Sequence, residues 1–563
     1  MRLGSRLFEG LRPLSAARAV HDALAGVNLA SIGAAQVLGY ARIAGMPVVT
    51  GLYTLLLPPI AFAIFGSSRH LVVAADSATA AILAGGVSHF AAPTAAHYAS
   101  LVGVLALWVA VFLFLARIFK LGFLADFLSR TVLVGFLAGV GCQVAIAMLA
   151  DMSGIAQTSR NSVVRLWELL EGAGQANLPT VALSAAAAAV ILLGKRFAPR
   201  WPLALVIVIA SIWASGIFGF AASGIAVIGP LAASLPAIGV PQVSWSEAIG
   251  LVPVAASCFV MIIAQSAATS RSFAVRYGES VDVNADILGL AAANAAAAVS
   301  GAFVVNGSPT QTATAERAGA RSQMAQLVMS GTVLVVLLLA SRELQYLPRG
   351  VLAAVVFAIA VRMVEVRTLL DIRRESPGEF QLAVATAATV VGLGVEQGIL
   401  LAIALSLFRH VRHSYQPHTM MFQPDPTGRW TPRPAEPGKV TEPGLIVYRF
   451  GADLFYANQG RFCSEVRALV RGAPTPVRYF VVDAAPITDL DYSASRSLRD
   501  LVEEFEGKGI QMIFGRVSPY LRADMDRHGI TAVLGDNHIF PTLHQALESA
   551  GVRTTPGTLN PAL

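Results

Sequence analysis

The sequence predicts a polytopic α-helical membrane protein that carries a small cytoplasmic α/β domain at its C-terminal end. The mean hydropathy of the 563 residues is +0.63, and 55% of them are hydrophobic while only 13% are charged. Apolar stretches of about helix-spanning length recur as far as residue 409, and a polar segment rich in proline follows them. This composition is typical of a chain whose main solvent is lipid.

Residues 1–18 are expected to form a cytoplasmic tail, because they carry arginines but no continuous apolar core that would indicate a signal peptide. The net charge is +7, but the basic residues are scattered between apolar segments, which indicates membrane topology and no nucleic-acid partner. The cysteines lie far apart in the sequence, so we expect buried thiols, no disulfide framework, no metal site and no cofactor. They are Cys142, Cys258 and Cys463.

A transmembrane transport domain is predicted over residues 19–409. About fourteen apolar segments lie within it, some shorter than the ~20 residues that a spanning helix needs. The connection 221–246 divides them into halves, about 19–220 and 247–409, which would lie in opposite orientation as in an inverted-repeat transporter. The segments lie near 20–38, 48–65, 70–87, 98–119, 131–151, 178–194, 202–220, 250–268, 283–304, 309–318, 322–341, 347–363, 379–394 and 395–409.

The distribution of Lys and Arg predicts that both termini are cytoplasmic and that the protein is a multi-pass protein of a bacterial inner membrane. The connection 221–246 contains no Lys or Arg and falls outside. Residues on the expected cytoplasmic side are Arg69, Arg117, Lys120, Arg130, Lys195, Arg196, Arg200, Arg271, Arg276, Arg317, Arg321, Arg362, Arg367, Arg373 and Arg374. Residues that fall on the opposite side are Arg42, Arg160, Arg165, Arg342 and Arg349.

Beyond residue 409 the chain is predicted to form a linker over 410–443, a soluble domain over 444–550 and a tail over 551–563. The linker is polar and rich in proline. The soluble domain alternates apolar strand-like runs such as GLIVYRF and VRYFVVDAA with stretches of helical periodicity such as SASRSLRDLVEEFEGKG. A small sheet with helices packed on it is therefore expected.

Two segments combine polar side chains with small residues, and each is the third element of its half. The stretch VVAADSATAAILAGG, residues 72–86, has Asp76 near its middle. The stretch SPTQTATAERAG, residues 308–319, is too short to span the membrane. Matching short segments in the two halves are the best sequence-level indication of a transporter's binding site.

A half-helix that begins in the middle of the membrane exposes unpaired backbone N–H groups and the positive end of its dipole. Two such ends that face each other would bind an anion. Asp76, Ser77 and Ser308 are favourable N-cap residues, and Pro309 fits a first helical turn.

The hydroxyl residues taken singly are expected to make structural hydrogen bonds within or between helices. They are Ser77, Thr79, Ser308 and Thr312. Asp76 differs, because a lone charge in the membrane costs ~3 kcal/mol or more and indicates a functional or paired residue.

Four stretches carry a resemblance to a known family. They are DALAGVNLASIGAAQVLGYARIAGMPVVTGLY with the following FGSSR, then SRSFAVRYGESVDVNADILGLAAAN, then NGSPTQTATAERAGARSQ, and finally VDAAPITDLDYSASRSL. In this order they cover most of the chain, which resembles the sulfate permease (SulP) family of anion transporters with a C-terminal STAS domain.

The resemblance implies a fold of seven plus seven segments with core and gate domains, and an elevator-like motion of the core. It implies an anion bound between the ends of the third and tenth helices. It also implies a homodimer, and a STAS domain that provides a dimer contact, has a regulatory role or binds a protein partner. The implied substrate is sulfate, bicarbonate, chloride or a dicarboxylate. The implied binding residues are Ala75, Asp76, Ser77, Ser308, Thr310, Gln311 and Thr312, and the implied cavity-lining residues are Gln36, Tyr40, Gln265 and Thr269.

The chain departs from the family pattern in both halves of the transport domain. Ala35 and Ala74-Ala75 replace residues that commonly break the first and third helices, and Thr310-Gln311 replaces a pair that often includes arginine. The tenth helix therefore lacks a fixed positive charge. In the soluble domain Tyr492 follows Asp491, where regulatory STAS relatives have a phosphorylated serine. We expect Asp491 to cap a helix.

The eighth segment has Gln265 where proton- or sodium-coupled relatives usually have a carboxylate. Glutamine cannot carry a proton or supply a full charge to sodium. Two interpretations of the coupling mechanism stay open at this point. The protein is an uncoupled carrier or exchanger, or Asp76 is the group that binds a coupled proton.

Two other functions fit parts of the sequence. A proton-coupled nucleobase carrier would use the same architecture, although the STAS-like region and FGSSR count against it. A membrane-anchored STAS signalling module would sense its ligand without moving it. An enzyme is not expected, because the apolar segments contain no paired carboxylates, metal-ligand spacing or nucleophile-base arrangement.

Overall fold

The computed structural model describes residues 7–12, 16–88, 90, 94–122, 129–155, 159, 162–197, 203–229, 235–424 and 430–552. The chain divides into two compact units, Met1–Leu407 and Phe408–Leu563. Arg160 and residues 553–563 of the predicted tail lie outside the described part of the chain.

The first unit is helical, and its two halves each contribute a short strand followed by a short helix. The first half contains α1 (Ala16–Ile43), α2 (Val48–Tyr53), α3 (Leu57–Phe65), β1 (Val73–Ala74), α4 (Ser77–Val87), α5 (Ala95–Ile118), α6 (Arg130–Ser153), α7 (Ser162–Glu171), η4 (Gly172–Gln175), α8 (Leu178–Phe197) and α9 (Leu203–Phe218). The second half contains α10 (Trp245–Gly250), α11 (Val252–Tyr277), α12 (Val283–Val299), β2 (Asn306–Gly307), α13 (Pro309–Arg317), α14 (Met324–Ala340), η5 (Ser341–Tyr346), α15 (Arg349–Met363), α16 (Val366–Glu375), α17 (Pro377–Gly392) and α18 (Val395–Tyr415).

Among the described residues, five helical segments are long and apolar enough to cross a bilayer by themselves: the one beginning at Ala19 in α1, the α2–α3 segment, α5, α6 and α11. The shorter apolar helices include α4, α8, α9, α12 and α14. The predicted tenth segment, 309–318, coincides with α13. The fold class expected from the sequence is confirmed.

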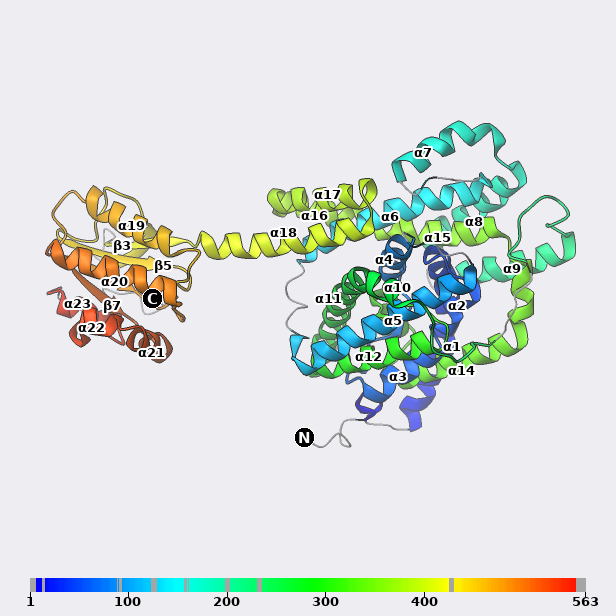
Figure 1. The fold of residues 1–563 in the computed structure, drawn as a ribbon, viewed down its shortest axis with the longest axis horizontal. Helices are drawn as coiled ribbons and strands as arrows, with labels where there is room; N and C mark the ends of the chain where they lie inside the picture. The colour runs from blue at the N-terminus through cyan, green and yellow to red at the C-terminus, as the bar shows by residue number, and fades with distance from the viewer. Residues whose placement is uncertain are drawn as a thin grey trace. The chain divides into compact units, whose positions relative to one another are not determined.

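The helices form two bundles within this unit. A core bundle comprises α1–α5 and α10–α14, in which α1 packs on α14 and α12 packs on α5 and α3. A gate bundle comprises α6–α9, α15–α17 and the part of α18 up to Leu407, and α6 packs on α15 and α17 (Figure 1). Small residues permit close approach: a β-carbon on Gly26 of α1 would lie 2.5 Å from the Ala325 carbonyl oxygen of α14. We call the membrane face at which α1 ends, at Ile43, the far face.

Strands β1 and β2 join the two halves inside the core bundle. They pair antiparallel, with Val73 opposite Gly307 and Ala74 opposite Asn306. All of these residues are buried. The pairing satisfies backbone groups of a non-helical segment within protein, as burial away from water requires.

The second unit is an α/β domain built on a five-stranded sheet of order β4-β3-β5-β6-β7. Strands β5, β6 and β7 are parallel, and β3 is antiparallel to β4 and β5. Its elements are β3 (Thr419–Pro424), β4 (Trp430–Pro434), β5 (Leu445–Phe450), α19 (Gln459–Gly472), β6 (Tyr479–Asp483), α20 (Tyr492–Gly507), β7 (Gln511–Gly515), α21 (Pro519–Arg527), α22 (Ile530–Leu534), η6 (Asp536–His538) and α23 (Leu543–Ser549).

The predicted linker over 410–443 differs from the structure, because α18 continues to Tyr415 and strands β3 and β4 belong to the sheet. Phe422 and Trp430 of these strands are buried in its core, which explains why a polar, proline-rich stretch is folded. Asp491 caps α20 as expected, since its carboxylate accepts a hydrogen bond from Ala494 N at 2.7 Å.

Candidate functional site

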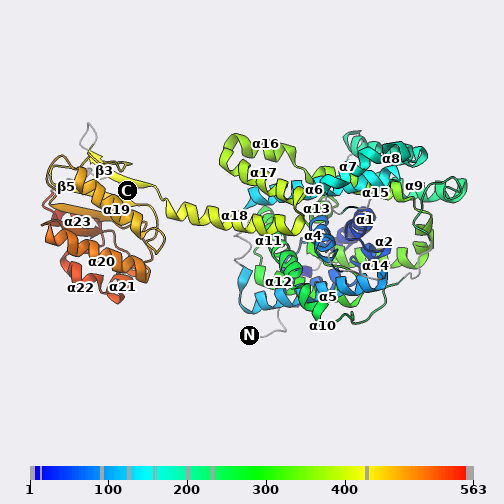
Figure 2. The same cartoon turned by 45° about the horizontal axis from the view of Figure 1, so that its top comes forward.

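The β1–β2 pairing brings the starts of α4 and α13 together in the interior of the first unit (Figure 2). Asp76 caps α4, and its Oδ2 accepts a hydrogen bond from Ala78 N at 3.1 Å. Ser308 caps α13 through a 3.4 Å hydrogen bond from Gln311 N. The Ser308 hydroxyl also donates to Asp76 Oδ1 at 3.3 Å. Of the three predicted N-cap residues, Asp76 and Ser308 are confirmed as caps, whereas Ser77 is the first residue of α4. The bond between the two caps joins the two helix starts.

Gln311 and Thr310 differ in how they are placed at the start of α13. Gln311 is fully buried, and its Nε2 donates to the Ala75 carbonyl oxygen at 3.3 Å. Its Oε1 is buried without a hydrogen-bond partner. Thr310 is exposed, and its hydroxyl lies 3.1 Å from the Ser308 hydroxyl. Buried polar atoms without partners are rare, so the amide of Gln311 is a candidate ligand-binding group.

One face of α1 lies against this helix start. A β-carbon on Gly33 would lie 3.7 Å from Gln311 Oε1. One turn further along, Gln36 Oε1 is buried without a partner, and the next turn brings the buried Tyr40 side chain next to Thr310. The stripe formed by Gly33, Gln36 and Tyr40 follows helical spacing and faces the site. The expected cavity-lining positions of α1 therefore lie beside the half-helices.

Of the two predicted residues of α11, Gln265 supports β2 and Thr269 bonds within its own helix. Gln265 Oε1 accepts a hydrogen bond from Asn306 Nδ2, and Thr269 donates to the Gln265 carbonyl oxygen at 2.7 Å. Ser266 donates to Asn306 Oδ1 at 2.8 Å and accepts from Gly307 N at 3.1 Å. Sequence reasoning missed Ser266 and Asn306 as members of this polar cluster, although Asn306 stands directly before the GSP turn.

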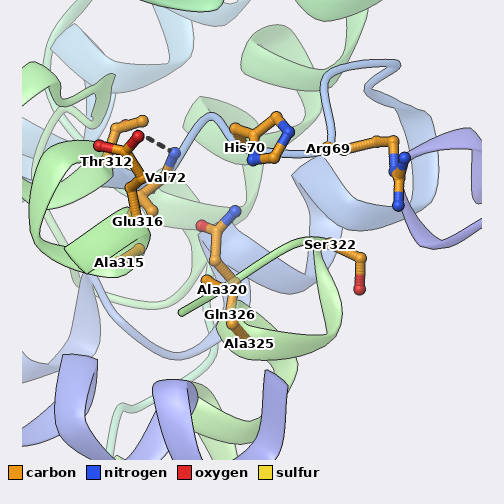
Figure 3. A pocket seen from close by; sticks show the side chains of 10 residues that line it. All are labelled: Arg69, His70, Val72, Thr312, Ala315, Glu316, Ala320, Ser322, Ala325 and Gln326. Atoms are coloured by element: carbon orange, nitrogen blue, oxygen red, sulfur yellow. Dashed lines mark hydrogen bonds between the residues drawn. The ribbon is translucent and has the colours of Figure 1, made fainter. Parts of the chain in front are cut away.

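Thr312 turns away from the start of α13. Its hydroxyl donates to the Ser308 carbonyl oxygen at 2.7 Å and accepts from Val72 N at 3.0 Å. It lines a small polar cavity behind β1, with a volume of about 10 Å³ (Figure 3). Such a volume has room for about one water molecule. The position of Thr312 supports a structural role for it, in line with the expectation for a single membrane hydroxyl.

The same cavity is lined by His70, in the connection between α3 and β1. The His70 ring stacks on Tyr277 with 4.5 Å between centroids, and its Nε2 lies 3.4 Å from Glu279 Oε2. Glu279 also pairs with Arg69 at 2.5 Å. Burial lowers the pKa of His70, because desolvation disfavours the imidazolium.

Arg362 lies elsewhere than the sequence predicts. Helix α15 lies against α1, because a β-carbon on Gly39 of α1 would lie 3.0 Å from Val356 Cγ2. It also lies against the middle of the 24-residue α6, because a β-carbon on Gly141 would lie 2.6 Å from the Ala360 carbonyl oxygen. The last turn of α15 therefore reaches about half the depth of the unit. Arg362, in that turn, acts electrostatically on the neighbouring Tyr40 hydroxyl and is exposed. It is a positive charge at the depth of the site, not in a loop.

Comparison with known proteins gives a consistent result for both units. Residues 20–386 match the sulfate permease family, and residues 436–546 match the STAS domain. A probable sulfate transporter of Mycobacterium tuberculosis is 32% identical over 530 residues, which cover 94% of each chain. Probable sulfate transporter 4.2 of Arabidopsis thaliana is 25% identical and matches 94% of this chain and 80% of its own.

Two solved structures have the same fold. The murine solute carrier 26 family member A9 anion transporter, in its inward-facing state, superposes with a TM-score of 0.87 at 19% identity, covering 98% of this chain and 95% of that one. The transmembrane domain of the cyanobacterial bicarbonate transporter BicA gives a TM-score of 0.61 at 19% identity, covering 70% of this chain and 98% of that one.

Proposed function

Because the chain belongs to the sulfate permease family and ends in a STAS domain, we propose that it is a secondary transporter of small anions in a bacterial plasma membrane. The observation that carries the proposal is the pair of half-helix starts joined through Asp76 and Ser308, with exposed Thr310 beside them. Both termini are cytoplasmic in this proposal, so the far face is the outer one.

The anion binds at the start of α13, because the residue that caps this helix, Ser308, carries no carboxylate that would compensate the positive end of the helix. Thr310 offers a hydroxyl, and Gln311 and Gln36 offer side-chain amides whose oxygens have no partner. Amide orientation is an assignment in any such structure, so Gln36 can present N–H donors to an anion after a half turn. Gln311 keeps the bond from its Nε2 to the Ala75 carbonyl oxygen and has the second Nε2 hydrogen to offer. Tyr40 supplies a further hydroxyl from α1.

The remaining predicted binding residues shape the site. Ala75 contributes its backbone, which holds Gln311, and Ser77 begins α4 behind its cap. Ser308 and Thr312 hold the helix start to β1, and Gln265 holds β2, while Thr269 bonds within its own helix α11. These residues position the donors and need not touch the anion.

In this proposal a positive charge of the gate bundle offsets the charge of Asp76. A carboxylate near the site repels an anion, and at short range this repulsion is strong in surroundings of low dielectric. Arg362 supplies a compensating positive charge from α15, which replaces the one that Thr310-Gln311 lacks. Protonation of Asp76 would remove the same repulsion, so Asp76 is also the candidate group for proton coupling.

Transport follows from motion of the core bundle relative to the gate bundle. Asp76, Gln311 and Tyr40 belong to the core, whereas Arg362 belongs to the gate. An elevator-like displacement of the core would carry the anion past Arg362 and expose it alternately on each face. A homodimer with STAS domains that contact each other or a protein partner belongs to the same proposal.

Sulfate is the favoured substrate, because the relatives that match most of this chain bear that name. Bicarbonate is the second candidate, from the name of one structural neighbour. The test is uptake of labelled sulfate, bicarbonate and fumarate into proteoliposomes, with and without an inward proton gradient, for the wild type and Asp76→Asn. Gradient-stimulated uptake that the variant loses assigns proton coupling to Asp76, and gradient-independent uptake in both identifies an uncoupled carrier or exchanger. Absence of flux of any of the three anions would contradict transport and favour a sensor.

A further inference from the structure

A second cavity lies between the core and gate bundles toward the far face. Its volume is about 440 Å³, and it is lined by α1, the C-terminal half of α4, and α6. Along α4 it reaches from Ser88 to Ala81, and Ala81 is one helical turn beyond Ser77. None of the residues assigned above to anion binding lines it. The cavity is therefore separate from the half-helix site but ends next to it.

Charged side chains from both bundles line this cavity. Arg42 of α1 donates from Nε and Nη2 to Asp151 Oδ2 of α6, at 3.2 and 2.6 Å. The two side chains are 40% and 32% exposed. Arg165 of α7 also lines the cavity, and its Nε donates to the Ser159 carbonyl oxygen at 2.7 Å. Two guanidinium groups and one carboxylate therefore line the cavity.

A buried amide adds a neutral binding group. Gln143 of α6 lines the cavity, and its Oε1 is buried without a hydrogen-bond partner. With the amide turned by half a rotation, the same position presents N–H donors. Arg42 and Arg165 are also two of the arginines that the charge pattern of the sequence placed on the unexpected face. A role in binding explains why they depart from that pattern.

We propose that this cavity is a loading site for the transported anion on the far face, in which the anion replaces the Asp151 carboxylate on Arg42. The inference rests on the proposed anion transport. A guanidinium binds the oxygens of a carboxylate and of a tetrahedral oxyanion with the same planar fork, so the two compete for it. A half-exposed ion pair is weak, which makes such replacement feasible.

Replacement of Asp151 would have a second consequence. The Arg42–Asp151 pair joins the far end of a core helix to a gate helix. While it is formed, it opposes displacement of the core relative to the gate on this face. An anion that binds Arg42 breaks that bond and enters the cavity, whose inner end lies one turn from Ser77, so loading and release of the core are coupled.

The test compares Arg42→Gln and Asp151→Asn with the wild type in proteoliposomes of defined orientation, with Arg342→Gln, an exposed far-face arginine outside the cavity, as the matched control. Arg42→Gln should raise the KM for sulfate supplied at the far face about tenfold, the loss expected for one charge-assisted hydrogen bond. Asp151→Asn should lower that KM, because it leaves Arg42 without a competing carboxylate. Unchanged KM values in Arg42→Gln and Asp151→Asn would overturn the loading site.

A readout that does not need transport separates this inference from the proposed function. Ala147 lines the cavity, so Ala147→Cys, in a chain with Cys142→Ser, reports access of a membrane-impermeant thiol reagent from the far face. Sulfate should slow the modification when Arg42 is present and have no effect in Arg42→Gln. Transport without such protection would overturn the loading site alone, and protection without transport would support the site while contradicting the carrier function.

Discussion

The Ser308 hydroxyl donates a hydrogen bond to Asp76 Oδ1 at 3.3 Å, so the cap of one half-helix holds the cap of the other. Residues 232 positions apart in the chain meet at this bond. It accounts for a carboxylate in an apolar stretch, because Asp76 both ends the extended β1 segment and satisfies the first turn of α4.

Substitutions of Asp76 should separate capping from charge. Asn can still accept the bond from Ala78 N, whereas Ala cannot, so Asp76→Ala should lower the free energy of unfolding by about 1 kcal/mol more than Asp76→Asn. Thermal unfolding in detergent measures the difference. Equal melting temperatures for the two variants would show that the cap contributes nothing.

Arg362 should govern affinity and not folding. In the proposed function the positive charge of Arg362 offsets Asp76, so Arg362→Gln should raise the KM for sulfate about tenfold with little change in Tm. Arg362→Lys should recover part of the affinity, since it keeps the charge but not the planar donor set. Arg367→Gln, on the exposed helix α16, is the matched control. A KM equal to the wild-type value in Arg362→Gln would refute this role.

Gln265 should act through Asn306. Gln265→Ala leaves the buried Asn306 amide without an acceptor and should cost about 1–3 kcal/mol of stability. Gln265→Glu retains an acceptor and introduces a titratable group beside the site, so it should fold and make sulfate uptake depend on pH. If sulfate uptake by Gln265→Glu had the same pH profile as uptake by the wild type, the placement of Gln265 beside the site would be contradicted.

His70 should make stability depend on pH. Its pKa is lowered in the folded protein by burial, among Glu279, Arg69, Arg321 and Glu316. The unfolded state therefore binds the proton first, and stability falls as the pH drops below about 6.5, the ordinary value for histidine. His70→Gln should flatten the fall of Tm below that pH, relative to the wild type and to the exposed control His544→Gln. A steeper fall in His70→Gln would reverse the sign of the argument.

The half-helices could be predicted from the sequence because their signals are local. A short segment of small and polar residues, a cap residue and a proline in the first turn define α13 without reference to the rest of the chain. The same holds for Asp76 and α4. The structure confirms these caps, while the transport roles of the site residues stay predictions.

Other features could not be predicted because they depend on tertiary contacts. Thr312 bonds Val72, and Asn306 bonds Gln265, across long separations that no spacing rule contains. The depth of Arg362 follows from α15, whose 15 residues extend only ~22 Å and end inside the unit. Strand β3 could not be predicted, because the residues around it are polar and rich in proline like those of a linker, although Phe422 is buried.

The most direct test of the central claim is the position of a bound anion. Selenate, a heavier analogue of sulfate, can be located by anomalous scattering in crystals of the full chain. The account predicts an anomalous peak at the start of α13, within hydrogen-bonding distance of Thr310 and Gln311 and beside Tyr40. A peak found elsewhere, with the start of α13 empty at a selenate concentration that saturates transport, would contradict it.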